Sequence, residues 1–164
     1  METAEARYQS LMRSIARHAP ATNLQLVDKA FRFADAKHKK QLRKSGEPYI
    51  IHPLAVAEIV VEIGLDTDAI LAALLHDCLE DTDASYEEIV KLFGPTVAEL
   101  VEGVTKLTRV NFSTTEEQQM ENLRKMFMAM SKDIRVILIK ISDRLHNMRT
   151  LEYQSTTKQY SKSM

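Results

Sequence analysis

An uninterrupted apolar run in the middle of the chain, residues 70–75, constrains the fold most strongly. Its letters are ILAALL, so a helix through it is apolar on every side. A helix of that kind belongs in the centre of a core, because no face of it is suited to water. We therefore expect the rest of the chain to pack around this segment.

Ionisable residues follow the apolar run at once. His76 and Asp77 are adjacent, and Glu80 and Asp81 come one turn later, where the helix is expected to end. Burying ionised groups costs several kcal/mol each unless they are paired or bind a metal. Anions at a helix C-terminus are also disfavoured by about 0.3–1 kcal/mol each. The combination indicates a functional site, although a neutralised His–Asp pair followed by a solvated acidic turn would also explain it.

The composition favours an all-α fold. The 164 residues are enough for one domain with a substantial core, and with few Gly and Pro residues no segment reads as a strand. We predict a bundle of about eight helices with no significant sheet. The net charge of −1 predicts neither nucleic-acid nor membrane binding, and one cysteine excludes a disulfide framework. No apolar run is long enough to cross a bilayer, which predicts a soluble, cytoplasmic protein.

Several helix starts can be predicted from capping residues. Asp66 or Thr67 is expected to cap the central helix, and Ser85 begins a capping box for the helix after it. Because proline suits the first helical position, His52 is expected at the N-cap of the helix before the central one.

Two later helices show apolar stripes that predict their core-facing sides. In the first the stripe is Met120, Leu123, Phe127 and Met130. In the second, which spans about 132–151, the main stripe is Ile134, Leu138, Ile141, Leu145 and Met148.

The opposite face of that last helix begins apolar and becomes polar. Val136 and Ile139 precede Asp143, Asn147 and Thr150 at steps of three and four residues. Asp143 is thus a carboxylate in a stripe that starts out buried. A helix that emerges into solvent would show the same pattern.

Polar groups at expected buried positions come from three separate segments: His52, His76 with Asp77, and Asp143. Two imidazoles and two carboxylates form a mixed nitrogen and oxygen ligand set, which suits Mn²⁺, Fe²⁺ or Zn²⁺ better than a thiolate-preferring ion. A divalent ion would also neutralise the buried carboxylates.

A basic loop precedes His52. Arg43, Lys44 and Ser45 lie in a stretch broken by Gly46 and Pro48. Two cations and a hydroxyl suit a phosphorylated ligand, although such a cluster taken alone is more often just a solvated loop.

Five ordered blocks between about Phe31 and Tyr153 point to a family. They are residues 43–53 (RKSGEPYIIHP), 76–82 (HDCLEDT), 103–107 (GVTKL), 122–126 (NLRKM) and 139–151 (IKISDRLHNMRTL). In these blocks the chain resembles the hydrolase domain of RelA/SpoT-type proteins, within the HD metallophosphohydrolase superfamily. The resemblance implies an all-helical HD fold and removal of the 3′-pyrophosphate from the alarmone (p)ppGpp, which leaves GDP or GTP.

The same resemblance implies roles for particular residues. Mn²⁺ would be held by His52, His76, Asp77 and Asp143. Glu80 and Asp81 match the acidic pair of hydrolase-competent members, and we assign Glu80 to the attacking water with Asp81 in support. The guanine nucleotide would be held by Arg43, Lys44, Ser45, Asn147 and Thr150.

The resemblance also predicts the domain organisation and leaves two alternatives for the function. We expect the hydrolase domain to span 1–153 and 154–164 to be a frayed or truncated tail. Family members commonly continue into synthetase and regulatory domains, and the sequence does not decide between a stand-alone hydrolase and a fragment. The alternatives are an HD-type hydrolase of another nucleotide, such as an NADPH phosphatase, and a non-catalytic alarmone-binding module.

Overall fold

The fold is all-α, as predicted. A computed structural model describes residues 3–43, 46–108 and 116–163, and the side chains of these except 129–130 and 152–163. Within this part the only β-type pairing is a single antiparallel bridge between Leu42 and Pro48. The helices are α1 (Ala4–His18), α2 (Leu24–Lys37), α3 (Ile51–Glu62), α4 (Thr67–Leu75), α5 (Cys78–Asp81), α6 (Tyr86–Phe93), α7 (Pro95–Thr108), α8 (Glu116–Lys132) and α9 (Ile134–Ser163).

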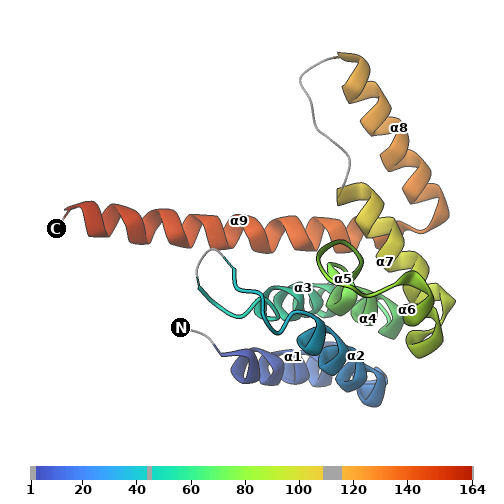
Figure 1. Cartoon of the computed structure of the whole chain (residues 1–164), viewed down its shortest axis with the longest axis horizontal. Coiled ribbons are helices and arrows are strands. Elements are labelled where there is room, and N and C mark those ends of the chain that lie inside the picture. The colour runs from blue at the N-terminus through green and yellow to red at the C-terminus, as the bar shows by residue number, and fades with distance from the viewer. Residues whose placement is uncertain (1–2, 44–45, 109–115, 164) are drawn as a thin grey trace.

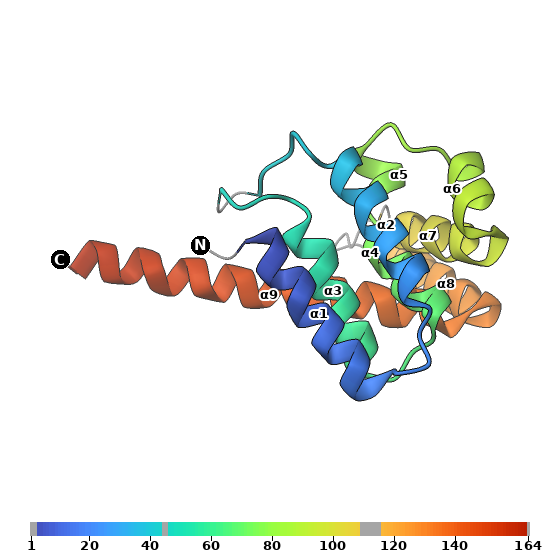
Figure 2. The same ribbon diagram turned by 90° about the horizontal axis from the view of Figure 1, so that it is seen from below.

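The central apolar segment is the centre of the core. Every residue of α4 from Ala69 to Leu75 is buried, which confirms the prediction from its composition. Helices α2, α3, α7 and α9 all pack against α4. Figure 2 shows α1 and α2 covering α3 and α4 from below.

The long helix α9 lies across α3 and α7 (Figure 1). Among the described side chains of α9, the buried apolar ones are Val136, Ile137 and Ile139, and Ser142 and Asp143 are buried as well. Helix α7 approaches these residues closely at Gly103. A Cβ atom added to this glycine would lie only 2.9 Å from Val136 Cγ2.

The main apolar stripe of α9 is largely exposed, whereas the opposite stripe, which was expected to start out buried, is buried at Val136, Ile139 and Asp143. Of its expected main stripe, Ile134, Ile141 and Met148 are 55%, 58% and 66% exposed. Both sides of this helix are apolar in its first half, so periodicity alone could not decide between them.

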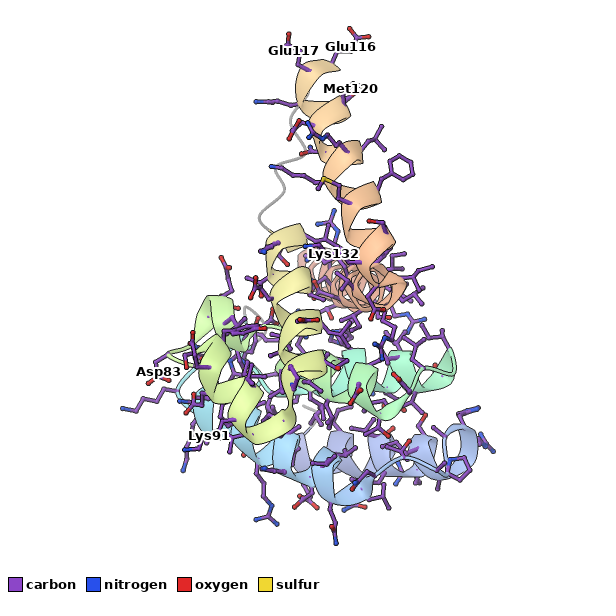
Figure 3. The ribbon with its side chains drawn as sticks, turned by 90° about the vertical axis from the view of Figure 1, so that its right-hand side faces the viewer. Asp83, Lys91, Glu116, Glu117, Met120 and Lys132 are labelled. Carbon is purple, nitrogen blue, oxygen red and sulfur yellow. The ribbon has the colours of Figure 1, made fainter. Side chains whose placement is uncertain are left out.

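Helix α8 projects away from the other helices (Figure 3), and its predicted core face is exposed. Met120, Leu123 and Phe127 are 67%, 48% and 65% exposed, and the side chain of Met130 lies outside the described part. Figure 3 shows Met120 near the outer end of α8 and Lys132 at its base. An apolar stripe predicts that a helix is amphipathic, but it does not say what covers the stripe.

The capping predictions hold for two helices. Asp66 Oδ1 accepts a hydrogen bond from the backbone N–H of Ala69 at 3.1 Å, and Ser85 Oγ accepts one from the N–H of Glu88 at 3.1 Å. Both bonds satisfy N–H groups that lack a partner inside the helix.

His52 is not an N-cap residue, contrary to the prediction. Helix α3 begins at Ile51, two residues before the predicted first helical residue Pro53, and the His52 N–H already bonds to the Tyr49 carbonyl in the preceding turn. Pro53 is then the third helical residue, where a missing N–H costs little because no intrahelical acceptor is available. The imidazole is therefore fixed within the first turn of a buried helix.

Helix α9 is longer than expected. Its backbone is helical to Ser163, beyond the predicted end near 151, while the domain boundary at 153 stays a prediction. Among the described residues, no helix is both long and apolar enough to span a membrane.

Candidate functional site

Three helices bring a cluster of potential metal ligands together. His52 lies in the first turn of α3, His76 directly follows α4, and Asp143 lies on the buried side of α9. One ligand atom from each of these three residues lies within 4.8 Å of the others, and all three residues are buried. Such a triad suits a divalent metal, as predicted from the sequence.

The distances place a fourth predicted ligand beside this triad. Asp143 Oδ1 is 2.6 Å from His52 Nε2 and 3.4 Å from His76 Nε2. Asp77 Oδ2 is 3.1 Å from His76 Nε2 and 3.8 Å from His52 Nε2. Asp77 therefore lies against both histidines of the triad, within reach of an ion held there.

The orientation of His76 fits a cation held by the triad. Its Nδ1 lies 2.6 Å from the Ala73 carbonyl oxygen and donates to it, since a carbonyl can only accept. Its Nε2 is buried with no hydrogen-bond partner among the described residues and faces the two carboxylates. A metal ion and a proton compete for this nitrogen. Burial opposes a charge on His76, but Asp77 and Asp143 outweigh it and raise the pKa to about 10.

The carboxylates are ionised at neutral pH. Burial would raise the pKa of Asp77 and of Asp143, but the neighbouring histidines outweigh burial and hold both pKa values well below the usual range. Burial lowers the pKa of His52, which favours the neutral form that can bind a metal. The charge states of Asp77, Asp143 and His52 therefore match those of metal ligands, whereas at His76 a metal ion must displace a proton.

Two further residues of α9 support the cluster, and the sequence analysis gave them no role. Lys140 Nζ donates to Asp143 Oδ2 at 2.8 Å and to Thr108 Oγ1 at 3.0 Å. His146 Nδ1 lies 2.8 Å from His52 Nδ1. Lys140 and His146 lie three residues before and after Asp143, the spacing that puts side chains on one helix face. From the sequence, only this spacing could have indicated that Lys140 and His146 lie near the site.

Tyr49 is the third contributor that the sequence analysis missed. Its hydroxyl lies 2.8 Å from Asp77 Oδ2 and 3.2 Å from Asp81 Oδ2, so it links a candidate ligand to the acidic pair. Burial and the charge of Asp77 raise the pKa of Asp81, and the Tyr49 hydrogen bond opposes that rise. The only indication of this role in the sequence is that Tyr49 lies three residues before His52.

The sequence suggested that the acidic pair, Glu80 and Asp81, lies at the end of the central helix. This prediction was wrong. Helix α4 stops at Leu75 and the chain turns at Asp77, where φ is −94° and ψ is −4°, before α5 begins. Glu80 and Asp81 belong to this separate short helix, and both are exposed. The Tyr49 hydroxyl connects Asp81 to the cluster.

Two of the predicted nucleotide-binding residues meet beside the cluster. Arg43 Nη2 donates to Asn147 Oδ1 at 2.9 Å, and Asn147 Nδ2 lies 3.4 Å from Asp143 Oδ1. The Arg43 backbone N–H also bonds to the Glu47 carbonyl oxygen at 2.9 Å, which ties the basic loop together. Arg43 Nη1 is buried and has no hydrogen-bond partner among the described residues, so it can donate to a ligand.

The other predicted nucleotide-binding residues are less informative. Thr150 lies one turn beyond Asn147 on α9, and its hydroxyl donates to the His146 carbonyl oxygen at 2.9 Å. Lys44 and Ser45 lie outside the described residues.

Comparisons with known proteins identify the family of the chain. A family model described as "HD domain" matches residues 30–163. A probable guanosine-3′,5′-bis(diphosphate) 3′-pyrophosphohydrolase of Synechocystis sp. is 58% identical over 134 residues, which are 82% of this chain and 18% of that protein. The bifunctional (p)ppGpp synthase/hydrolase SpoT of Escherichia coli K12 is 52% identical over 144 residues, which are 88% of this chain and 20% of that protein. The chain thus spans about a fifth of the length of these curated relatives.

A solved structure is similar over most of its length. It is described as a metazoan ortholog of SpoT that hydrolyzes ppGpp, and it matches with a TM-score of 0.60 and 35% sequence identity. The match covers 78% of this chain and 71% of that one.

Proposed function

Because the chain belongs to the HD domain family, we propose that it is a Mn²⁺-dependent guanosine-3′,5′-bis(diphosphate) 3′-pyrophosphohydrolase. It would convert (p)ppGpp to GDP or GTP and pyrophosphate. The observation that carries this proposal is the convergence of two imidazoles and two carboxylates beside the Arg43–Asn147 pair. The names of the relatives support the substrate. The proposal includes a hydrolase domain over 1–153 and a cytoplasmic location.

The proposed metal ligands are His52, His76, Asp77 and Asp143. The set combines imidazole with carboxylate and lacks thiolate, which suits Mn²⁺, Fe²⁺ or Zn²⁺, and the resemblance to RelA/SpoT-type hydrolases favours Mn²⁺ among them. When bound, a divalent ion supplies Lewis acidity toward a phosphoryl oxygen and lowers the pKa of water. Asp77 and Asp143 are already ionised and the neutral form of His52 is favoured, as binding requires, while His76 gives up a proton when the ion binds.

The proposed nucleotide site begins at Arg43. Its guanidinium can stack on a purine base or bond to phosphate oxygens, and an ammonium does both less well. One of its nitrogens is held by Asn147, which fixes the plane of the group, and the other is available to the ligand. Thr150, together with Lys44 and Ser45, completes the proposed set.

The proposed proton acceptor is Glu80. A carboxylate that takes a proton from the attacking water contributes about 10²–10⁴-fold to the rate. Asp81 would support it, because its contact with Tyr49 ties α5 to Asp77. The exposure of both carboxylates leaves them accessible to water and to a substrate phosphate.

The test is product analysis after incubation with ppGpp. We expect GDP and pyrophosphate in the presence of Mn²⁺, no turnover after chelation, and recovery when Mn²⁺ is added back. Asp143→Ala should lose metal, because it removes a ligand. NADPH is the control substrate. Phosphate release from NADPH but not from ppGpp would overturn the proposal, and so would tight ppGpp binding without turnover.

A further inference from the structure

His52 is held at both of its ring nitrogens by residues of one helix. Asp143 Oδ1 lies 2.6 Å from Nε2, and His146 Nδ1 lies 2.8 Å from Nδ1. Asp143 and His146 are three residues apart on α9, so both reach the same imidazole. The ring of His146 lies beside that of His52, with centroids 5.0 Å apart and an interplanar angle of 29°.

The contact between the two Nδ1 atoms restricts where hydrogens can be. At 2.8 Å one nitrogen must carry a hydrogen and the other must carry a lone pair, since two hydrogens would clash and two lone pairs would repel. The position of the hydrogen on one ring therefore determines its position on the other ring. His52 and His146 form a coupled pair of tautomers.

A metal ion at the proposed site would select one member of this pair. A histidine binds a metal through a nitrogen lone pair, and Nε2 is the nitrogen of His52 that faces the cluster. The hydrogen of neutral His52 must then lie on Nδ1, and His146 must accept it. His146 would carry its own hydrogen on Nε2.

We propose that His146 is a positioning residue that fixes His52 in the Nδ1–H form and so makes Nε2 available to the metal. The inference rests on the metal site of the proposed function and adds a residue to which no role has been assigned. His146 is well placed for it. The residue is half-buried, and its partner His52 is only 2% exposed, so water cannot easily replace the contact. Partners of metal-bound histidines generally affect metal affinity by about 10–100-fold when they are removed.

The two tautomeric pairs interconvert without a net gain or loss of protons. In the alternative pair, His52 carries its hydrogen on Nε2 and bonds to Asp143, while His146 donates from Nδ1. On passing to the metal-binding pair, His52 loses the Nε2 hydrogen to water and gains the Nδ1 hydrogen of His146. His146 takes a hydrogen from water on Nε2. Neither ring changes its charge.

Calorimetric titration with Mn²⁺ tests the proposal without any measurement of turnover. His146→Phe keeps a ring beside His52 but has no acceptor, and we expect the dissociation constant to rise by about 10–100-fold. His146→Asn places a carbonyl oxygen near the position of Nδ1, and we expect most of the affinity to return. Met148→Ala changes a side chain that is 66% exposed on the same helix, and it should bind as the wild type does.

The outcomes separate the inference from the proposed function. Equal affinity in wild type and His146→Phe would overturn the role of His146 and leave the metal site intact. The role of His146 is overturned in the same way if His146→Asn binds as weakly as His146→Phe. Wild-type protein that binds no Mn²⁺ would overturn both. Thermal unfolding without metal shows whether each variant is folded.

A second measurement needs no variant. In ¹⁵N-histidine-labelled wild-type protein with Zn²⁺ as a diamagnetic probe, NMR reports which ring nitrogen of each histidine carries a hydrogen. We expect His52 to be protonated at Nδ1 and His146 at Nε2. A hydrogen on Nδ1 of His146 in the Zn²⁺-bound protein would overturn the proposal even if no variant folds.

Discussion

Lys140 and Asp143 form an ion pair that leaves one carboxylate oxygen available to the metal site. Lys140 Nζ lies 2.8 Å from Oδ2, while Oδ1 faces His52 and His76. Asp143 is only 5% exposed, so water contributes little to its stabilisation. The lysine therefore orients the carboxylate and compensates part of its charge.

Lys140→Met should destabilise the metal-free protein. Removal of one partner of a buried charged group typically costs about 1–3 kcal/mol, and Met keeps most of the apolar stem. Loss of a positive charge beside the cluster should also strengthen its attraction for a divalent ion. We therefore expect the variant to have a lower Tm without metal and a larger rise in Tm on addition of Mn²⁺ than the wild type.

Lys106→Met is the matched control for this prediction. Lys106 pairs with Glu102 at 2.9 Å on α7, but its side chain is 67% exposed. Such surface pairs contribute about 0–1 kcal/mol, so stability and the response to Mn²⁺ should change little. An Mn²⁺-induced rise in Tm that is the same in Lys140→Met and wild type would contradict the assigned role of Lys140.

Arg43 and Asn147 should act as a unit in substrate binding. Arg43→Ala removes the proposed contact to the nucleotide, and Asn147→Ala removes the group that holds the guanidinium in place. We expect each to raise KM about 10-fold with a smaller change in kcat, because the contact is made in the ground and transition states alike. The double variant should be little worse than either single one, since residues that share a contact are not additive.

Arg149→Ala is a control for these single and double variants. It removes an exposed cation from α9, the helix that carries Asn147. Its KM should stay at the wild-type value. Simple additivity in the double variant would show that Arg43 and Asn147 act independently, and a loss of kcat at unchanged KM would place Arg43 in the chemical step.

Tyr49→Phe should impair catalysis more than folding. The hydroxyl bridges the carboxylates of Asp77 and Asp81, and its removal frees the Asp81 side chain to shift relative to the ligands, although backbone bonds still hold α5. The ring would remain beside His38, at a centroid distance of 4.6 Å. We expect a loss of about 1 kcal/mol in stability and a fall of about 10-fold in kcat.

Tyr8→Phe provides the comparison for Tyr49→Phe. Tyr8 also donates to a carboxylate, that of Asp28, at 3.0 Å, but on the side of the molecule formed by α1 and α2. It should lose similar stability and keep full kcat. Equal kcat values in the two variants would remove Tyr49 from the site.

The sequence was most informative where a residue contradicts its surroundings. The all-apolar run before His76 has only one environment that suits it, which is why the central helix could be placed. His52, His76 and Asp143 could be identified because ionisable side chains among buried apolar residues need a compensating partner. The same reasoning could not find Tyr49, Lys140 or His146. Polar residues near a turn or on an amphipathic helix are ordinary, and only the folded arrangement shows what they contact.

The exposure of the main apolar stripes on the last two helices could not be predicted for a different reason. Ile134 and Val136 lie on different sides of α9, and both sides are apolar near its start. The close approach of α7 at Gly103 decides between them, and that contact joins segments 33 residues apart in sequence. On α8, Phe127 belongs to a regular stripe that no other described helix covers enough to bury. Periodicity describes one helix at a time, whereas burial depends on its neighbours.

Glu80→Gln tests whether this carboxylate takes the proton from water. Glutamine keeps the size and much of the hydrogen-bonding capacity of glutamate but cannot accept a proton at neutral pH. Because Glu80 is exposed in the short helix α5, we expect unchanged stability, or slightly raised stability from reduced repulsion between neighbouring carboxylates. Metal content and KM should stay near the wild-type values, and kcat should fall by about 10²-fold or more.

Asp81→Asn is the comparison for Glu80→Gln and should lower kcat less. Metal loss in Glu80→Gln would make Glu80 a ligand. Full kcat in that variant would assign the proton to Asp81 or to the hydroxide that the metal itself supplies.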